Sequence, residues 1–309
     1  MGFLFEKLLK LFFLFSIIPF LLSEKLQKKY DLKLHPQVTY SIFSGPKKVA
    51  AIEEKFLDET SGMAVSRKFP EIIYLHNDSG GSAELFLLDT LGKYRGKILL
   101  EGTKNRDWED LAIGPGPAAG QSYLYLGDIG DNFSVHEELL IYRFPEPPVL
   151  RGELSVNPER IKLRYPDGAK DAETLLLDPL SGDLYLLTKR DARNTLYKAA
   201  AADLQDGSTV ELEKVLELPI TLSVAGDISA DGRQVAIKNY WVVYYWERDP
   251  ALSLEETLRQ PARLLPYEPE PQGEALAFSP DGNSYFTLSE KKLRVQPVLY
   301  RYARIPVPE

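Results

Sequence analysis

A short pattern occurs five times along this chain, and it limits the folds that the chain can adopt. Each copy begins with small or acidic residues, continues as an alternating apolar run and ends in a turn. The copies are ETSGMAVS (59–66), DWEDLAIG (107–114), DAETLLLD (171–178), VAGDISAD (224–231) and QGEALAFS (272–279). Alternation with a period of two indicates β-strands. Its recurrence predicts a fold built from repeated units.

Further apolar runs follow each copy. Second and third runs are separated by turn-forming residues, such as the Asp-Gly pairs of SADGR and SPDGN. A weaker fourth run follows the first four copies, at 96–102, 160–166, 213–219 and 262–268. Five units of four strands predict an all-β fold, a five-bladed β-propeller. One short helix is expected over 252–260.

The fifth unit is incomplete, because only three strands fit after Glu274. The segment KKVAAIEEKF (47–56) lies before the first unit and can supply the missing strand. Pairing of the two chain ends in this way would close the ring and remove an exposed edge. A six-bladed propeller and a β-sandwich are the alternatives.

The N-terminal residues have the features of a targeting segment. Lys7 and Lys10 precede an apolar run from Leu11 to Leu22, which suits a signal-peptide core and is short for a membrane span. We therefore expect a signal peptide or anchor (1–23), a polar linker (24–46) and a β-propeller domain (47–309). The protein would be secreted or periplasmic. The alternative is attachment to a membrane, solely through an uncleaved N-terminal segment.

The composition excludes several kinds of site. The 309 residues include no cysteine, so disulfides, thiolate metal sites and cysteine nucleophiles are ruled out. The formal net charge is −8 and no Lys/Arg run is present, so no nucleic-acid partner is expected. An acidic surface suits a cation or a cationic partner.

Acidic residues recur where the first strand of each unit begins. Aligned on the apolar runs, the first position holds Ser61, Glu109, Glu173, Gly226 and Glu274, and the next holds Gly62, Asp110, Thr174, Asp227 and Ala275. In a propeller these strands line a central channel, so the carboxylates would meet and repel one another.

A hard divalent cation would relieve that repulsion. Calcium takes about six to eight oxygen ligands. Zinc is a poorer candidate, because it is usually bound by histidine and cysteine and this chain has only three histidines and no cysteine. The expected calcium ligands are Ser61, Glu109, Glu173, Asp227 and Glu274. Alternatively, these acids accept hydrogen bonds from backbone amides between the blades and bind no ion.

Polar loops after the second strands should reach the same face. We expect Asp78, Asp128 and Asp131 to position or activate water as catalytic residues. Side chains that could hold a phosphorylated substrate are Asn77, Asn132, Lys189, Arg190 and Lys238. The alternative is a solvated rim of loops without catalytic function.

The motifs TSGMAV, WEDLAI, LYLGDIG, DAETLLL, AGDIS and GEALAF resemble those of the calcium-activated nucleotidases, also called soluble apyrases. The resemblance implies a secreted five-bladed propeller with calcium in its channel, held by Ser61, Glu109, Glu173 and Glu274. The chain departs from that family at HNDSG (76–80), where adjacent acids followed by arginine are expected. It is also similar to uncharacterised bacterial secreted propellers with DWED and GDIGDN motifs.

Together these features predict an exported calcium-binding propeller that hydrolyses phosphate esters or anhydrides. The rival hypothesis is a non-enzymatic module that binds an extracytoplasmic protein or glycan, with calcium as a structural ion. Phytase-like and esterase-like propellers share the architecture, so the fold alone does not choose between these functions.

Overall fold

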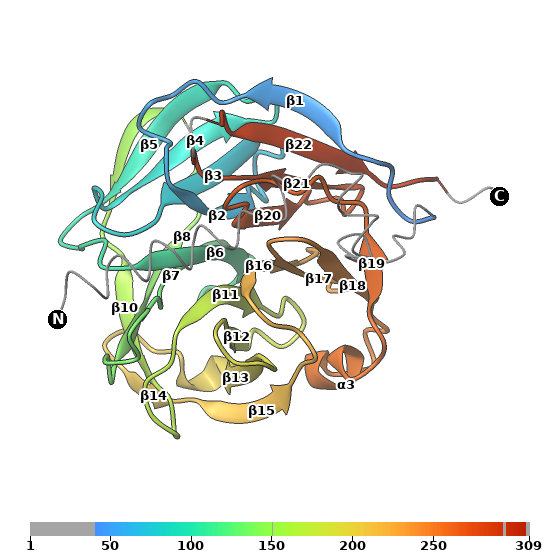
Figure 1. The fold of residues 1–309 in the computed structure, drawn as a ribbon. Helices are drawn as coiled ribbons and strands as arrows, with labels where there is room; N and C mark the ends of the chain where they lie inside the picture. The colour runs from blue at the N-terminus through green and yellow to red at the C-terminus, as the bar shows by residue number, and fades with distance from the viewer. Residues whose placement is uncertain (1–40, 150, 293–294, 307–309) are drawn as a thin grey trace, which may run out of the picture.

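The fold is a ring of five sheets in which neighbouring strands are mostly antiparallel. The computed structural model describes residues 41–149, 151–292 and 295–306 of the chain. Figure 1 shows the sheets arranged as blades around a centre, with one inner strand of each blade beside it. The predicted five-bladed β-propeller is therefore confirmed.

The blades follow one another in chain order. Blade 1 consists of β2 (Thr60–Val65), β3 (Ile72–Asn77), β4 (Glu84–Asp89), β5 (Tyr94–Leu100) and β9 (Gly152–Val156). Blade 2 consists of β6 (Trp108–Pro115), β7 (Ser122–Asp128), β8 (Leu139–Pro145), β10 (Glu159–Arg164) and β14 (Thr209–Glu211). Blade 3 consists of β11 (Ala172–Leu177), β12 (Leu184–Thr188), β13 (Thr195–Ala199) and β15 (Glu213–Glu217).

The last two blades complete the ring. Blade 4 consists of β16 (Ser223–Ile228), β17 (Gln234–Asn239), β18 (Val243–Glu247) and β19 (Arg263–Leu265). Blade 5 consists of β20 (Ala275–Phe278), β21 (Ser284–Leu288), β22 (Val298–Ala303) and β1 (Lys47–Ala51). All four predicted fourth runs overlap outer strands, namely β5, β10, β15 and β19.

The two ends of the described chain close the ring as predicted. Strand β1 pairs antiparallel with β22, and the two run side by side in Figure 1. Phe43, which falls within the expected linker, forms a β-bridge with Arg304 and is fully buried. The expected leader (1–23) and most of the linker lie outside the described residues.

Two outer strands were not predicted. Strand β9 lies in sequence between strands of blade 2 but pairs parallel with β5 of blade 1. Strand β14 lies between strands of blade 3 but pairs parallel with β10 of blade 2. The chain segments of blades 2 and 3 thus each supply a strand to the preceding blade, which covers an edge that would otherwise be exposed.

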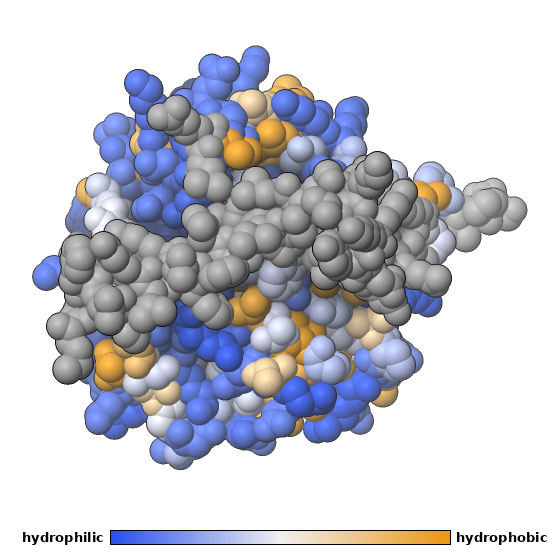
Figure 2. All heavy atoms as spheres, viewed as in Figure 1, coloured by the Kyte–Doolittle hydropathy of each residue, from blue (hydrophilic) through white to orange (hydrophobic). Residues whose placement is uncertain are grey.

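The hydrophobic core is divided among the interfaces between blades. Five clusters of buried apolar side chains occur, and each joins two neighbouring blades. This follows from the period of two, because alternate side chains of a strand point to opposite faces of its sheet. On the face seen in Figure 2, the visible periphery is mostly hydrophilic.

The predicted short helix is also present. Helix α3 (Leu254–Leu258) begins after a capping box, in which Ser253 and Glu256 accept hydrogen bonds from each other's backbone amides. A 3₁₀ turn occurs at Ala201–Asp203. Within the described ranges, no helix has the length and apolar character needed to cross a membrane.

Candidate metal centre at the mouth of the channel

A β-bulge recurs at the start of the inner strands. Register shifts fall at Ser61–Gly62 in β2, at Glu109 in β6, at Glu173 in β11 and at Val224 in β16. Glu274 directly precedes β20, at the equivalent place in blade 5. A bulge places two residues opposite one and re-aims the extra side chain. We call this end of the channel the mouth.

The bulges correct the predicted alignment in blade 4. Val224, rather than Gly226, occupies the position of Glu109 and Glu173. Asp227 therefore lies three residues farther along β16, and its oxygens accept hydrogen bonds from the amides of Ile228 (2.8 Å) and Phe278 (2.7 Å). The alignment failed because it followed the apolar run, which cannot reveal a bulge. Asp227 does not join the carboxylates at the mouth.

Asp110 also serves the backbone. Its carboxylate accepts hydrogen bonds from the amides of Leu111 and Leu175, both at 2.9 Å. The hydroxyl of Ser61, an expected calcium ligand, donates to the carbonyl of Glu109 at 2.7 Å. Asp110 and Asp227 therefore accept hydrogen bonds from backbone amides, as in the alternative to ion binding.

Two of the expected glutamate ligands surround a lysine. The ammonium of Lys189 contacts the Glu173 carboxylate and lies 3.9 Å from Oε1 of Glu274. Glu274 also accepts a hydrogen bond from the hydroxyl of Tyr240 (2.6 Å). Lys189 is 4% exposed. This half of the mouth therefore contains its own counter-ion.

The other half contains three carboxylates without one. Oxygens of Asp78, Asp107 and Glu109 lie within 4.8 Å of one another. Glu109 is 3% exposed. Among the described residues, no cationic side chain lies within ion-pair distance of these three carboxylates, although the more distant charges of Arg106 and Lys189 act on Asp107 and Glu109. A group of unpaired, closely spaced carboxylates fits a cation.

The backbone at Gly130 approaches the carboxylates closely. A methyl group on Gly130 would overlap with Oε1 of Glu109 and with the carboxylate of Asp107. Gly130 is fixed there because its amide donates to the carbonyl of Asp107 at 3.2 Å. The side chain of Asn105 donates to the carbonyls of Asn77 and Asp78 and accepts from the amide of Trp108. The two segments that carry the carboxylates are thereby joined.

The electrostatics agree with the geometry. Burial, and then the neighbouring acids, raise the pKa of Asp78 to about 7 and that of Asp107 to about 6. Burial and the charge of Glu173 also raise the pKa of Glu109 well above its usual range. Without a cation, protonation relieves the repulsion, whereas a bound cation would favour the charged forms.

The other expected site residues lie around this cluster or apart from it. Asp128 accepts from the amide of Asp107 (3.1 Å) and pairs with Arg106 (3.2 Å). Asp131 accepts from the amide of His136 at 2.7 Å. Arg190 pairs with Asp171 at 2.5 Å and donates to the side chain of Asn132.

Two expected substrate ligands have structural contacts instead. The ammonium of Lys238 is fully buried, donates to the carbonyl of Gly273 and lies 4.7 Å from the ring centre of Tyr267. Asn77 donates to the carbonyl of Phe56 at 2.6 Å. Lys238 is thus not open to a phosphate in this conformation. The same holds for Lys189, whose ammonium lies between Glu173 and Glu274.

Sequence reasoning missed Asp107 and Gly130 as parts of the site. A signal for Asp107 was present, because Glu59 and Asp171 stand at the same offset, two residues before the bulge. No sequence signal distinguished Gly130 from the other glycines in turns, since its role depends on the neighbouring segment.

Comparisons with known proteins add little about function. The sequence matches no protein-family model, and no curated protein is significantly similar to it. Among solved structures, it is similar to U3-55K, with 10% identity, a TM-score of 0.44 and coverage of 84% of this chain and 98% of that one.

Two further structures are similar at the same level. A gluconolactonase from Xanthomonas campestris has 14% identity, a TM-score of 0.42 and coverage of 80% of this chain and 72% of that one. A chain of a nidogen/laminin complex has 11% identity, a TM-score of 0.43 and coverage of 80% and 84%. Such low similarities say nothing about function, and the fold assignment rests on the strand pairing.

Proposed function

We propose that the protein is an exported β-propeller that binds calcium at Asp78, Asp107 and Glu109 and uses it to hydrolyse phosphate esters or anhydrides. The observation that carries this proposal is the convergence of three unpaired carboxylates beside a glycine at the channel mouth. Residues 1–23 would export the chain or anchor it. This ligand set replaces the predicted ring of inner-strand residues and retains only Glu109 from it.

The donor set suits calcium better than zinc. All three candidate ligands offer carboxylate oxygens, and hard cations such as calcium prefer oxygen. The nearby histidine His76 is buried with its edge against Trp108, and burial lowers its pKa to about 4. Asp78 and Asp107 are partly exposed, so they face the solvent from which an ion and a substrate would arrive.

Hydrolysis would use the polar residues around the ion. A bound divalent cation polarises a phosphoryl oxygen and lowers the pKa of water. Asp128 holds the backbone of Asp107 in place, and its own pKa is raised by burial. Arg190 is exposed and could turn from Asp171 and Asn132 toward an anionic substrate. Asp131 fixes the loop that follows Gly130.

One observation favours the rival function, a binding module with a structural ion. Phe133 and Val135, in the loop after Asn132, are 60% and 66% exposed. Exposed apolar side chains next to a polar mouth suit contact with a protein or the apolar face of a sugar. In this alternative, calcium would fix the loop and no catalysis would occur.

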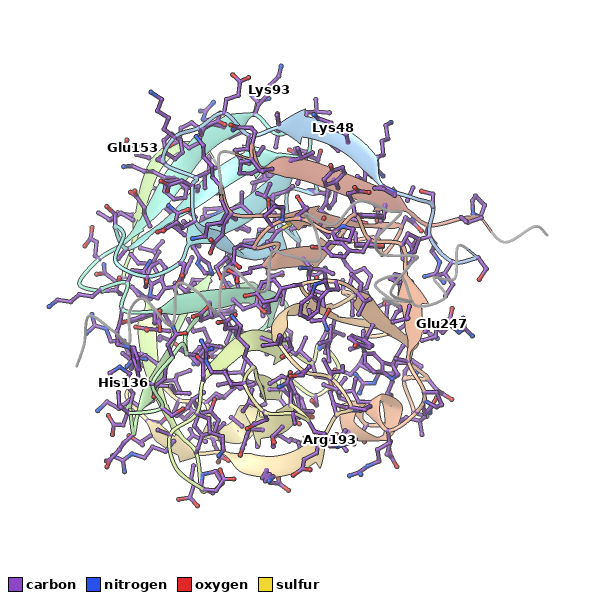
Figure 3. All side chains as sticks on the ribbon, in the orientation of Figure 1. Lys48, Lys93, His136, Glu153, Arg193 and Glu247 are labelled. Atoms are coloured by element: carbon purple, nitrogen blue, oxygen red, sulfur yellow. The ribbon has the colours of Figure 1, made fainter. Side chains whose placement is uncertain are left out.

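The test combines ion binding with an assay of hydrolysis. Calcium binding to the purified protein is measured by isothermal titration calorimetry, and Tm is measured with calcium and with a chelator. Release of phosphate from nucleoside di- and triphosphates and from p-nitrophenyl phosphate is then followed. Glu109→Gln and Asp107→Asn are compared with Glu153→Gln, which changes an exposed residue of β9 on the periphery (Figure 3).

The outcomes separate the hypotheses. We expect a calcium-dependent rise in Tm and calcium-dependent turnover, both lost in the two site variants and kept in the control. Binding without turnover of any of these substrates would favour the rival function. No binding of calcium would overturn the proposal. N-terminal sequencing of the protein recovered outside the cytoplasm tests export.

A further inference from the structure

We infer that the ammonium of Lys189 fills a second cation position in the channel and so limits the mouth to one divalent ion. This inference extends the proposed function, because it assumes that the mouth binds cations. It concerns the half of the mouth formed by Glu173, Glu274 and Glu290.

The backbone shows that Lys189 and Gly130 occupy equivalent positions in their blades. The amides of Asp78, Gly130, Lys189 and Glu290 each donate to a carbonyl just before an inner strand, namely that of Glu59, Asp107, Asp171 or Gln272. Four blades thus present one residue each at the same position of the mouth. The residues are an acid, a glycine, a lysine and an acid.

The side chains at this position determine what each blade can hold. In blade 2, this position carries a glycine whose backbone lies against the carboxylates of Asp107 and Glu109, so no side-chain cation is present there. In blade 3, the same position carries a lysine whose ammonium contacts Glu173, the counterpart of Glu109. Blade 3 therefore supplies a covalently attached cation at the position where blade 2 supplies none.

The surroundings of Lys189 resemble those of a bound ion. Its ammonium has Glu173 on one side, Oε1 of Glu274 at 3.9 Å and the ring centre of Tyr240 at 5.3 Å. It is 4% exposed. A lysine ammonium is a compact charge that belongs to the chain, so no ion has to be captured, but it carries no coordinated water that could act on a substrate. The half that contains Lys189 would be structural.

The number of bound ions tests the inference. Lys189→Met removes the charge and keeps most of the volume, whereas Lys189→Arg keeps the charge. Each purified protein is equilibrated with calcium, and bound calcium per chain is measured by elemental analysis after gel filtration. We expect one ion in the wild type and in Lys189→Arg, and two in Lys189→Met. The calcium-induced rise in Tm should be larger in Lys189→Met than in the wild type.

The outcomes distinguish this inference from the proposed function. One ion in Lys189→Met, with the wild-type rise in Tm, would overturn the inference. No ion in the wild type but one in Lys189→Met would reject the proposed site and support the inference.

If Lys189→Met folds only with calcium, the inference is supported, because the ion then replaces the ammonium. If it folds under neither condition, Lys189→Met/Glu173→Gln is compared, since this pair removes both charges. The inference requires the double variant to fold and to bind a single ion. A double variant that stays unfolded, or that binds two ions, would contradict it.

Discussion

Gly130 shows how one residue without a side chain can make a site. Its Cα lies against the carboxylates of Asp107 and Glu109, and any Cβ would occupy the space between them. Its backbone does not have a positive φ, so the requirement for glycine comes from space and not from conformation. The backbone segments that carry the acids are held by hydrogen bonds with Asn105, Asp128 and Gly130, and these bonds do not depend on an ion.

Gly130→Ala is therefore expected to weaken calcium binding while leaving the fold intact. The methyl group would displace the carboxylates, and we expect calcium affinity to fall at least about tenfold, or about 1.4 kcal/mol. Gly81→Ala is the matched control, because a Cβ there meets only Asn105, at 4.0 Å. Calorimetric titration measures both. Unchanged affinity in Gly130→Ala would reject the assigned site.

The raised pKa of Asp78 predicts that the stability of the calcium-free protein depends on pH. The folded-state pKa of about 7 lies above the ordinary value of 3.8 for an aspartate, so the folded protein binds the proton more tightly than the unfolded chain. Stability from this group is thus present below about pH 4 and is lost as pH rises through about 7. Asp78→Asn removes the titration and leaves other groups, such as His76, in place.

In a chelator, we expect Asp78→Asn to be more stable than the wild type above about pH 4, where the unfolded carboxyl is ionised and the folded one is still protonated. This advantage should grow by about 2–3 kcal/mol between pH 5 and pH 8, because one pKa unit corresponds to about 1.4 kcal/mol. Thermal unfolding across this pH range measures the difference. A difference that does not change with pH would contradict a raised pKa of Asp78.

At the scale of elements, the bulge at the start of four of the inner strands decides which residues reach the mouth. It places Ser61, Glu109 and Glu173 at the same position of three blades, and an apolar valine in the fourth. Neighbouring blades are held together mainly by apolar packing. A buried ion pair also joins blades 3 and 4, because the two terminal nitrogens of the Arg248 guanidinium donate to the carboxylate of Asp178, at 2.7 and 3.0 Å.

Loss of one member of this pair should destabilise the interface of blades 3 and 4. Arg248→Met leaves the carboxylate of Asp178 buried without its partner, which typically costs about 3–5 kcal/mol. Arg263→Met is the control, since its pair with Glu247 (3.0 Å) is about half exposed, and its loss should cost about 0.5 kcal/mol. Denaturant unfolding measures both. Equal losses would show that burial of the Asp178 pair has no effect.

At the scale of the whole molecule, the ring depends on its closure. Blade 5 takes its outer strand, β1, from the other end of the described chain. Phe43 continues this closure into the core, where its ring centre lies 5.0 Å from that of Tyr285 and 6.0 Å from that of Tyr245. One side chain therefore joins the N-terminal segment to strands of blades 4 and 5.

Phe43→Ala should weaken the closure by about 3–5 kcal/mol, the usual cost of truncating a buried phenylalanine. Phe133→Ala, at a residue that is 60% exposed, should change stability by about 0.5 kcal/mol or less. Unfolding by denaturant compares the two variants. A similar small effect of both would mean that the segment around Phe43 does not contribute to closure.

The fold could be predicted from the sequence, because the alternation of apolar residues and the turn residues are local signals that repeat in every blade. These signals predicted the five blades, the closing strand β1 and helix α3. They did not predict β9 and β14, since the pairing of a strand with the preceding blade depends on which edges lie close in space.

Only the tertiary structure decided the composition of the candidate site. The sequence singled out Glu109, Glu173 and Glu274 as acids at inner-strand starts, but their partners come from loops far along the chain. The structure places Lys189 between Glu173 and Glu274 and sets Asp78 and Asp107 beside Glu109. Charge balance in a buried cluster is a sum over neighbours in space. No spacing along the chain could show which acids already had a counter-ion and which had none.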